Sequence, residues 1–312
     1  MTVAVRSRPM GTGTEFVLDN GAVVVRVWTY GASLAGVCDR GRELVLRPPD
    51  PAGPRGPWHD CYIGSTLGRY ARVVSDATAT IDGTTYRLGR NAGRHHLHGG
   101  ATGFDTKVWS GRGRAGRDRG IVRLTLTSPD NEEGYPGTLL ATAWFSLDTA
   151  DRVVVDYQAH TDRPTLCGLT CHAFWNLGDG TIDDHVLTTM ARTVVETDAE
   201  FVPTGRLHDH PSLGRCSPLD AMGIDHCLDA RDPGHRELRL ACPATGHAVT
   251  LTTNQSCIAV YTGDALPSRR AGICLQPGPW PDTPHRLEFP SAELRPGERY
   301  RNRTELTLEH PT

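Results

Sequence analysis

Short segments with a two-residue period, interrupted by glycine and proline, dominate this chain. Side chains alternate strictly at 78–82 and 123–127, which is typical of a strand with one buried face and one wet face. Segments rich in Val, Thr and aromatic residues predict strands at Val23–Tyr30, Thr78–Ile81, Ile121–Thr127, Leu139–Leu147 and Arg152–Ala159. Because long amphipathic helices are hard to find, the fold class is predicted to be all-β.

The length fits one large domain. A chain of 312 residues exceeds the usual domain size, but β-sandwiches and barrels often run this long without dividing. The proline-rich stretch 48–57 and the Arg/Gly stretch 111–120 are loop-sized, and no period repeats along the chain. We therefore expect residues 1–312 to form a single, mostly antiparallel β-sandwich domain.

The charge balance and the cysteines exclude several classes of protein. Lys and Arg total 33 against 36 Asp and Glu, so no strong field attracts nucleic acid or an anionic membrane. The first residues lack the apolar core of a signal peptide, and nine cysteines without a C-x-x-C pair fit reduced thiols. We expect a cytoplasmic monomer or homodimer that acts on a small molecule and binds neither nucleic acid nor membrane.

Two motifs are weak indications of a bound cofactor. Gly111, Gly113 and Gly116 match G-x-G-x-x-G, but the dinucleotide motif must open a helix, and here a strand follows. Cys171 and His172 are adjacent, so on a strand their side chains would point to opposite faces and could not share a metal. The sequence predicts a hairpin tip at 111–120 and neither a metal nor a cofactor.

Histidine is the residue type best suited to proton transfer near neutral pH. His172 lies in the apolar run LTCHAFWNL, where Phe174 and Trp175 could stack on a ligand. His98 precedes a Gly-Gly pair that allows close approach of a ligand. For each histidine the alternative is a structural residue with satisfied hydrogen bonds, and the acidic segment SPDNEEGYPG at 128–137 could be no more than a solvated loop.

Taken together, the motifs resemble the aldose 1-epimerase (galactose mutarotase) family. The resemblance covers nearly the whole chain, in matching order and spacing. It rests on GRYA at 68–71, LHGG at 97–100 followed by GFD, SPDNEEGYPG, LTCHAFWNL, GIDHC at 223–227, YTG at 261–263, and ICLQPGPWPD at 273–282 followed by FPSAELRPGERY.

The resemblance implies a large β-sandwich with a substrate cleft across one curved sheet. It also implies a cofactor-independent reaction in which a glutamate takes the proton of the anomeric hydroxyl while a histidine protonates the ring oxygen. Position by position, His172 matches the family's acid, His98 a sugar-contacting histidine, and Asp225 an aspartate that binds a sugar hydroxyl. Further residues expected to bind the substrate are Gln276, Arg72, Arg69, Trp175, Tyr261 and Trp280.

The sequence departs from the family pattern at the general base. The family's C-L-E-x-Q reads Cys274-Leu275-Gln276 here, and an amide cannot accept a proton at neutral pH. The Asn-Arg pair after GRYA reads Arg72-Val73, and the glutamine before YTG reads Ala259. Arg72 would replace the missing guanidinium only if the strand alternation were broken there.

Three functions fit this altered set of residues. The first is a mutarotase-like enzyme that uses His172 and His98 for dehydration or cyclisation of a larger oxygenated substrate, as in a biosynthetic lyase or cyclase. The second is an aldose 1-epimerase, an isomerase of sugar anomers, whose base has moved to Asp225, Asp282 or a water held by Gln276. The third is a carbohydrate-binding protein without turnover.

Overall fold

The computed structural model describes residues 2–53, 56–214, 216–219 and 223–311. Its regular structure consists mostly of antiparallel strands with a few short 3-10 helices. These helices are η1 (His59–Cys61), η2 (Ser75–Ala77), η3 (Phe104–Thr106), η4 (Glu132–Gly134) and η5 (Pro233–His235). Among the described residues, no helix has the length and apolar character needed to cross a bilayer.

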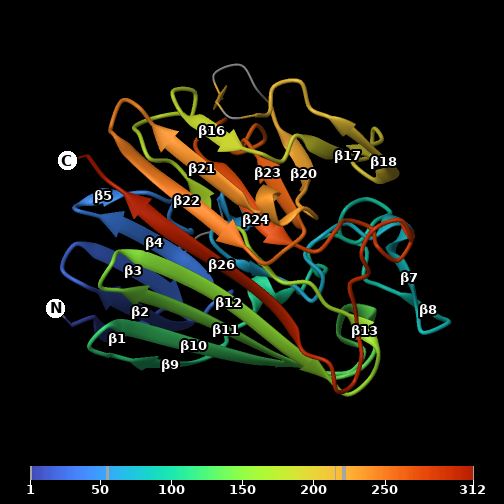
Figure 1. Ribbon diagram of the computed structural model, residues 1–312. Helices are drawn as coiled ribbons and strands as arrows, with labels where there is room; N and C mark the ends of the chain where they lie inside the picture. Colours follow the sequence, from blue (N-terminus) through green and yellow to red (C-terminus); the bar gives the residue numbers. More distant parts are fainter. Residues whose placement is uncertain (1, 54–55, 215, 220–222, 312) are drawn as a thin grey trace.

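The large sheet runs across the front of Figure 1, from green strands through red to orange and yellow. Its alternating residues point one face into the core, as Val153, Val155 and Tyr157 do from β12. In spatial order its strands are β9 (Ser110–Arg114), β10 (Arg119–Ser128), β11 (Leu139–Asp148), β12 (Arg152–Thr161), β26 (Tyr300–Glu309), β22 (His247–Thr253), β21 (Glu237–Cys242), β16 (Val186–Thr189) and β19 (Ser217–Pro218).

A second sheet, which we call the cavity sheet, carries the functional residues discussed below. Its strands, in order, are β15 (Phe174–Trp175), β24 (Ile273–Gly278), β23 (Cys257–Tyr261), β20 (Asp225–Asp229), β17 (Thr193–Thr197) and β18 (Pro203–Asp209). The two sheets are joined by Asn302 of β26, whose side-chain amide donates to the carbonyl of Pro277 on β24 at 2.8 Å. Apolar side chains from both sheets belong to one core cluster, which confirms the predicted all-β sandwich.

The N-terminal strands form a third sheet that adds to the same core. Its strands are β1 (Ala4–Met10), β2 (Gly13–Asp19), β3 (Val23–Trp28), β4 (Ser33–Asp39) and β5 (Arg42–Glu43). Short pairs complete the fold: β13 (Thr165–Leu166) with β25 (Glu293–Leu294), β14 (Thr170–Cys171) with β6 (Thr66–Leu67), and β7 (Thr78–Ile81) with β8 (Thr84–Arg87).

The five strands predicted from segments rich in Val, Thr and aromatic residues are confirmed as β3, β7, β10, β11 and β12. The Arg/Gly stretch is a correction, because it is more than a hairpin tip. Ser110–Arg114 pairs with β10 and forms the edge strand of the large sheet. Gly111 and Gly113 face the side chain of Phe16, where an added Cβ would lie 2.7 and 3.1 Å from the ring. These glycines therefore permit close packing on β2.

Candidate active site

A cavity of about 530 Å³ opens over the cavity sheet. Two rows of side chains from the central strands contribute to its floor. The strand register places Gln276, Ala259 and Cys227 side by side in one row, and Tyr261 beside Asp225 in the next. The walls come from segments 60–62, 72–73 and 92–98, from His172 and Phe174, and from the β17–β18 hairpin. The cavity thus gathers residues from many distant parts of the chain.

His98 and His172 face each other in this cavity. Their ring centroids lie 5.5 Å apart with an interplanar angle of 74°. His172 is placed by backbone bonds, since its N–H donates to Ser65 and its carbonyl accepts from Gly64. His98 has a left-handed backbone, with φ of 58°. Two imidazoles this close can act on neighbouring atoms of one ligand.

The ring of His172 is almost fully buried, with 6% of the residue exposed. Burial lowers its pKa well below the ordinary value, and the neighbouring imidazole of His98 lowers it further. Its Nδ1 lies 3.7 Å from the Sγ of Cys274, and burial raises the pKa of that thiol so that it stays protonated. His172 is therefore a neutral imidazole at physiological pH.

The proton of His98 can be placed from its surroundings. Nδ1 lies 3.0 Å from the carbonyl oxygen of Ala71, and since a carbonyl only accepts, Nδ1 must carry the proton. Nε2 is then an unprotonated acceptor. Burial lowers the pKa of His98 to about 4. The next residue, Gly99, packs on Gly68 so closely that an added Cβ would lie 1.8 Å from its carbonyl oxygen.

Asp225 and Tyr261 lie on adjacent strands across the floor from the histidines. Asp225 is exposed as a whole residue, but its carboxyl group is desolvated, and this raises its pKa to about 6. The positive charge of Arg72 lowers the pKa by a smaller amount. The hydroxyl of Tyr261 accepts a hydrogen bond from the backbone of Ala265 at 2.6 Å. Both side chains line the cavity and can meet hydroxyl groups of a ligand.

Arg72 lies against Gln276 in spite of the alternation expected for neighbouring residues. Its Nη1 donates to Gln276 Oε1 at 3.1 Å and its Nη2 to the backbone carbonyl of Gln276 at 2.7 Å. Both Arg72 and Val73 line the cavity. This is possible because residues 71–73 belong to no strand, so the two-residue period does not apply there. The guanidinium thus does occupy the site from the neighbouring position.

Three residues expected at the substrate lie outside the cavity lining. Arg69 is buried and donates to backbone carbonyls of the 128–137 segment, so it supports that loop. Trp175 follows Phe174 on β15, and the alternation that points Phe174 to the cavity points Trp175 into the core. Trp280 packs on Phe289 at 4.7 Å, and its Nε1 donates to Ser256.

Two of the carboxyl groups considered from the sequence have structural roles. Asp282, one suggested base, is fully buried, accepts from the backbone and hydroxyl of Ser75, and does not line the cavity. Glu133 of the acidic segment accepts from Thr102 N at 2.7 Å and packs where a Cβ on Gly100 would stand. The acidic segment therefore shapes the LHGG turn, which is more than a solvated loop would do.

Sequence reasoning missed Tyr62 and the position of Cys274. Tyr62 lines the cavity, and its ring centroid lies 5.1 Å from that of His98 and 5.9 Å from that of His172. It follows a proline-rich loop and has a left-handed backbone, so no strand pattern predicts where its side chain goes. The place of Cys274 follows from the strand pairing: it lies opposite Phe174, two residues after His172.

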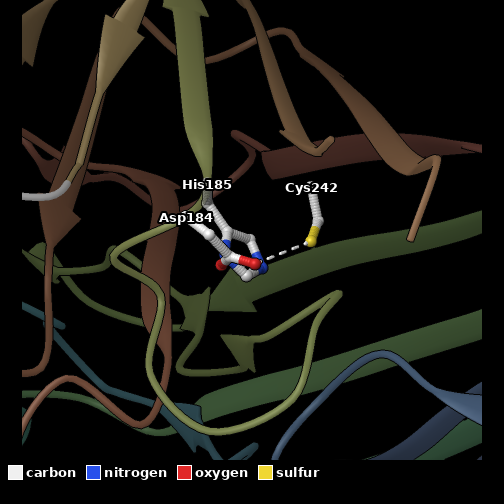
Figure 2. Close-up of side chains that lie close together, drawn as sticks. All are labelled: Asp184, His185 and Cys242. Carbon is white, nitrogen blue, oxygen red and sulfur yellow. Dashed lines mark hydrogen bonds and ion pairs between the residues drawn. The ribbon is translucent and has the colours of Figure 1, made fainter. Parts of the chain in front are cut away.

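A cluster of possible metal ligands lies on another part of the fold. Figure 2 shows Asp184, His185 and Cys242 with side chains converging. His185 Nδ1 bonds to Asp184 at 2.7 Å, and its Nε2 accepts from the backbone N–H of Leu177 at 2.9 Å. The thiol of Cys242 donates to the other carboxylate oxygen of Asp184. Both ring nitrogens of His185 already form hydrogen bonds. The cluster therefore fits a structural role, in which it holds the 177–185 loop in place, better than a metal centre.

Comparison with known proteins agrees with this arrangement. The aldose 1-epimerase family model matches residues 14–307. The human protein named galactose mutarotase is 32% identical over 95% of this chain and 94% of its own length.

The chain belongs to the aldose 1-epimerase family. Membership places it among isomerase-type enzymes. The aldose 1-epimerase of Escherichia coli K12 is 28% identical over 92% of both chains. Two solved structures share the fold: galactose 1-epimerase from Lactobacillus acidophilus, with TM-score 0.87, 22% identity and 99% of each chain covered, and an aldose epimerase homologue from C. elegans, with TM-score 0.85, 23% identity and 99% and 100% covered.

Proposed function

We propose that this member of the aldose 1-epimerase family interconverts the anomers of a free sugar, with a histidine in place of the glutamate base. His98 takes the proton of the anomeric hydroxyl, the bond from the anomeric carbon to the ring oxygen breaks, and His172 donates a proton to that oxygen. The open-chain aldehyde then rotates and recloses on either face. The observation that carries this proposal is the 5.5 Å spacing of the two rings, because the two oxygens involved are bonded to one carbon.

The basicity of His98 suits it to replace the missing glutamate base. Its pKa of about 4 is near the ordinary value for a glutamate, about 4.3, so its Nε2 has much the same proton affinity as the carboxylate it would replace. Its other nitrogen is held by the Ala71 carbonyl, which leaves Nε2 as the only acceptor. His172 then acts as a neutral donor, as a buried imidazole can when negative charge develops on a nearby oxygen.

Gln276 takes a different part from the family glutamate. Its side-chain oxygen already accepts from Arg72, so its NH2 group is the end left to donate to a substrate oxygen. Asp225 and Tyr261 meet other hydroxyls across the floor. Arg72 fixes the amide so that it presents its donor side, which helps to hold the anomeric oxygen in place for proton transfer.

The pH dependence of mutarotation tests the proposal and identifies the base. Polarimetry on galactose and glucose should show rates above the buffer background. After subtraction of that background, kcat/KM should fall as the pH drops through about 4, where His98 becomes protonated. A fall centred near pH 6 would instead assign the base to Asp225. A rate equal to background with folded protein would rule the proposed reaction out.

A rescue experiment separates the two possible base positions. His98→Ala should lower mutarotation by roughly 100-fold or more, as expected for loss of a general base. Adding Gln276→Glu should then recover at least about tenfold of the rate, because it restores the family's carboxylate. Arg72, 3.1 Å from the side-chain oxygen at position 276, should keep that carboxylate ionised.

The matched control for this rescue is His98→Ala with Gln276→Met, which has similar volume and no carboxylate. Equal rates for the two double variants would show that position 276 no longer contacts the anomeric oxygen.

A second candidate is dehydration or cyclisation of a larger, less polar oxygenated substrate. It is favoured by the apolar side chains at two former sugar contacts, Val73 and Ala259, both of which line the cavity. The same His98 and His172 would remove a C–H proton beside a carbonyl and protonate the leaving hydroxyl. The test is to incubate the folded protein with a β-hydroxy ketone. A product that has lost one water, together with no mutarotase activity, would support this candidate.

A further inference from the structure

A second cavity, of about 490 Å³, adjoins the candidate active site at Tyr62. The two cavities share Asp60 and Tyr62 in their linings, and the LHGG turn contributes to both, through His98 to the first and Gly100 to the second. The volume falls in the range of small-molecule sites, roughly 300 to 1,000 Å³. No step of the reaction proposed above uses this cavity.

The lining combines aromatic rings with polar groups. Trp28, Tyr30 and Tyr62 supply the rings, while Ser33, Ser65 and Asp105 supply oxygens. The described residues that line it include neither Arg nor Lys. Apolar faces of a sugar or polyol pack on aromatic rings, and its hydroxyls need acceptors and donors. An anionic ligand such as a sugar phosphate would instead lack a cationic partner here.

Gly31 packs closely against polar groups beside this cavity. Gly31 has a left-handed backbone, and an added Cβ would lie 2.7 Å from the carbonyl oxygen of Asp105 and 2.9 Å from Ser33 Oγ. Ser33 donates to the carbonyl of Tyr30 and lies 3.3 Å from Ser65 Oγ, so both hydroxyls keep the capacity to accept. A larger residue at position 31 would clash with these groups and displace the two serines.

Asp105 has an unpaired oxygen in this region. Its Oδ1 is shielded from solvent and has no hydrogen-bond partner among the described residues. Burial also raises its pKa to about 7, which lets the carboxyl both donate to and accept from hydroxyl groups near neutral pH. Buried polar groups are almost always paired in folded proteins, so an unpaired one indicates a missing partner.

From these aromatic rings and polar groups we infer that the second cavity binds a neutral polyhydroxylated ligand, such as a sugar ring, separately from the proposed catalytic cavity. The inference does not depend on which reaction the first cavity catalyses. Since the ring of Tyr62 touches both His98 and His172, a ligand packed against it in the second cavity would restrict its movement and thereby the arrangement of the proposed catalytic pair.

Calorimetric titration with methyl β-galactoside tests the inference, because its capped anomeric oxygen prevents turnover. Ala101 is exposed and lines the second cavity, so Ala101→Trp should block it and weaken, at least about tenfold, the binding that remains when Ala259→Trp fills the first cavity. Ala115→Trp, on the distant turn between β9 and β10, is the matched control and should bind like the wild type. Ala259→Trp fills the catalytic cavity and should leave the second site intact.

A second readout covers the case in which Ala259→Trp does not fold. Hydrogen exchange of the wild-type amides at 30–33 and 101–106 should slow when the glycoside is added. The inference is overturned if the wild type binds no glycoside, if Ala101→Trp binds as tightly as Ala115→Trp, or if exchange slows only around the catalytic cavity. Tighter binding of glucose 6-phosphate or glucosamine than of the neutral glycoside would overturn the assigned ligand class.

Discussion

His172→Ala is expected to lower turnover of the sugar substrate by roughly 100- to 10,000-fold, the usual loss when a general acid or base is removed. The reason is that His172 is the more buried member of the proposed catalytic pair; backbone hydrogen bonds hold it, and its ring centroid lies 5.1 Å from that of Phe174. Little water can reach this ring to act in its place. Stopped-flow or NMR mutarotation rates at pH 7 measure the effect.

The control for that substitution is His172→Gln, which should keep much of the binding because the amide can still form a hydrogen bond. His98→Ala should weaken binding and rate together, since in the proposed mechanism the same ring orients the substrate and accepts its proton. Near-wild-type turnover of folded His172→Ala would mean that the site works by positioning alone, and the acid–base mechanism would have to be abandoned.

Arg69→Ala is expected to lower the free energy of unfolding by roughly 3 to 5 kcal/mol. The guanidinium is 2% exposed and donates to Ser128 Oγ and to the carbonyls of Ser128, Pro129, Pro136 and Gly137. Removing it leaves these buried acceptors without a donor, and each unsatisfied group costs about 1 to 3 kcal/mol before relaxation. Urea unfolding at pH 7 measures the loss.

Arg112→Ala is the matched control for Arg69→Ala, because Arg112 is exposed on edge strand β9; its unfolding free energy should change by no more than about 0.5 kcal/mol. The folded fraction of Arg69→Ala should keep its KM, since Arg69 does not line the cavity. A raised KM with unchanged stability would show instead that Arg69 contacts the substrate.

Gln276 stands where the resemblance implies a glutamate, and it contacts Arg72, which is a second departure from the family motif. A glutamate beside this guanidinium would form a buried ion pair, whereas the amide forms a neutral hydrogen-bonded contact that keeps one donor side free. In the proposed mechanism, the two changes together turn the position that the resemblance assigns to the base into a hydrogen-bond donor.

The sequence was sufficient for five of the strands and for the identity of the family. Alternation is a local property with a period of two residues, so β7 and β10 could be predicted without knowing their partners. The motifs around His98, His172, Asp225 and Gln276 name residue types in order, and the structure brings those four side chains to one cavity.

Only the tertiary structure decided which neighbouring side chains meet the substrate space. Arg72 faces the cavity because its segment is not a strand, while Trp175 and Trp280 turn to packed regions. Tyr62 joins the histidines through a left-handed turn after a proline-rich loop. The direction of a side chain in an irregular segment depends on contacts with residues far along the chain, and a local period carries no information about those contacts.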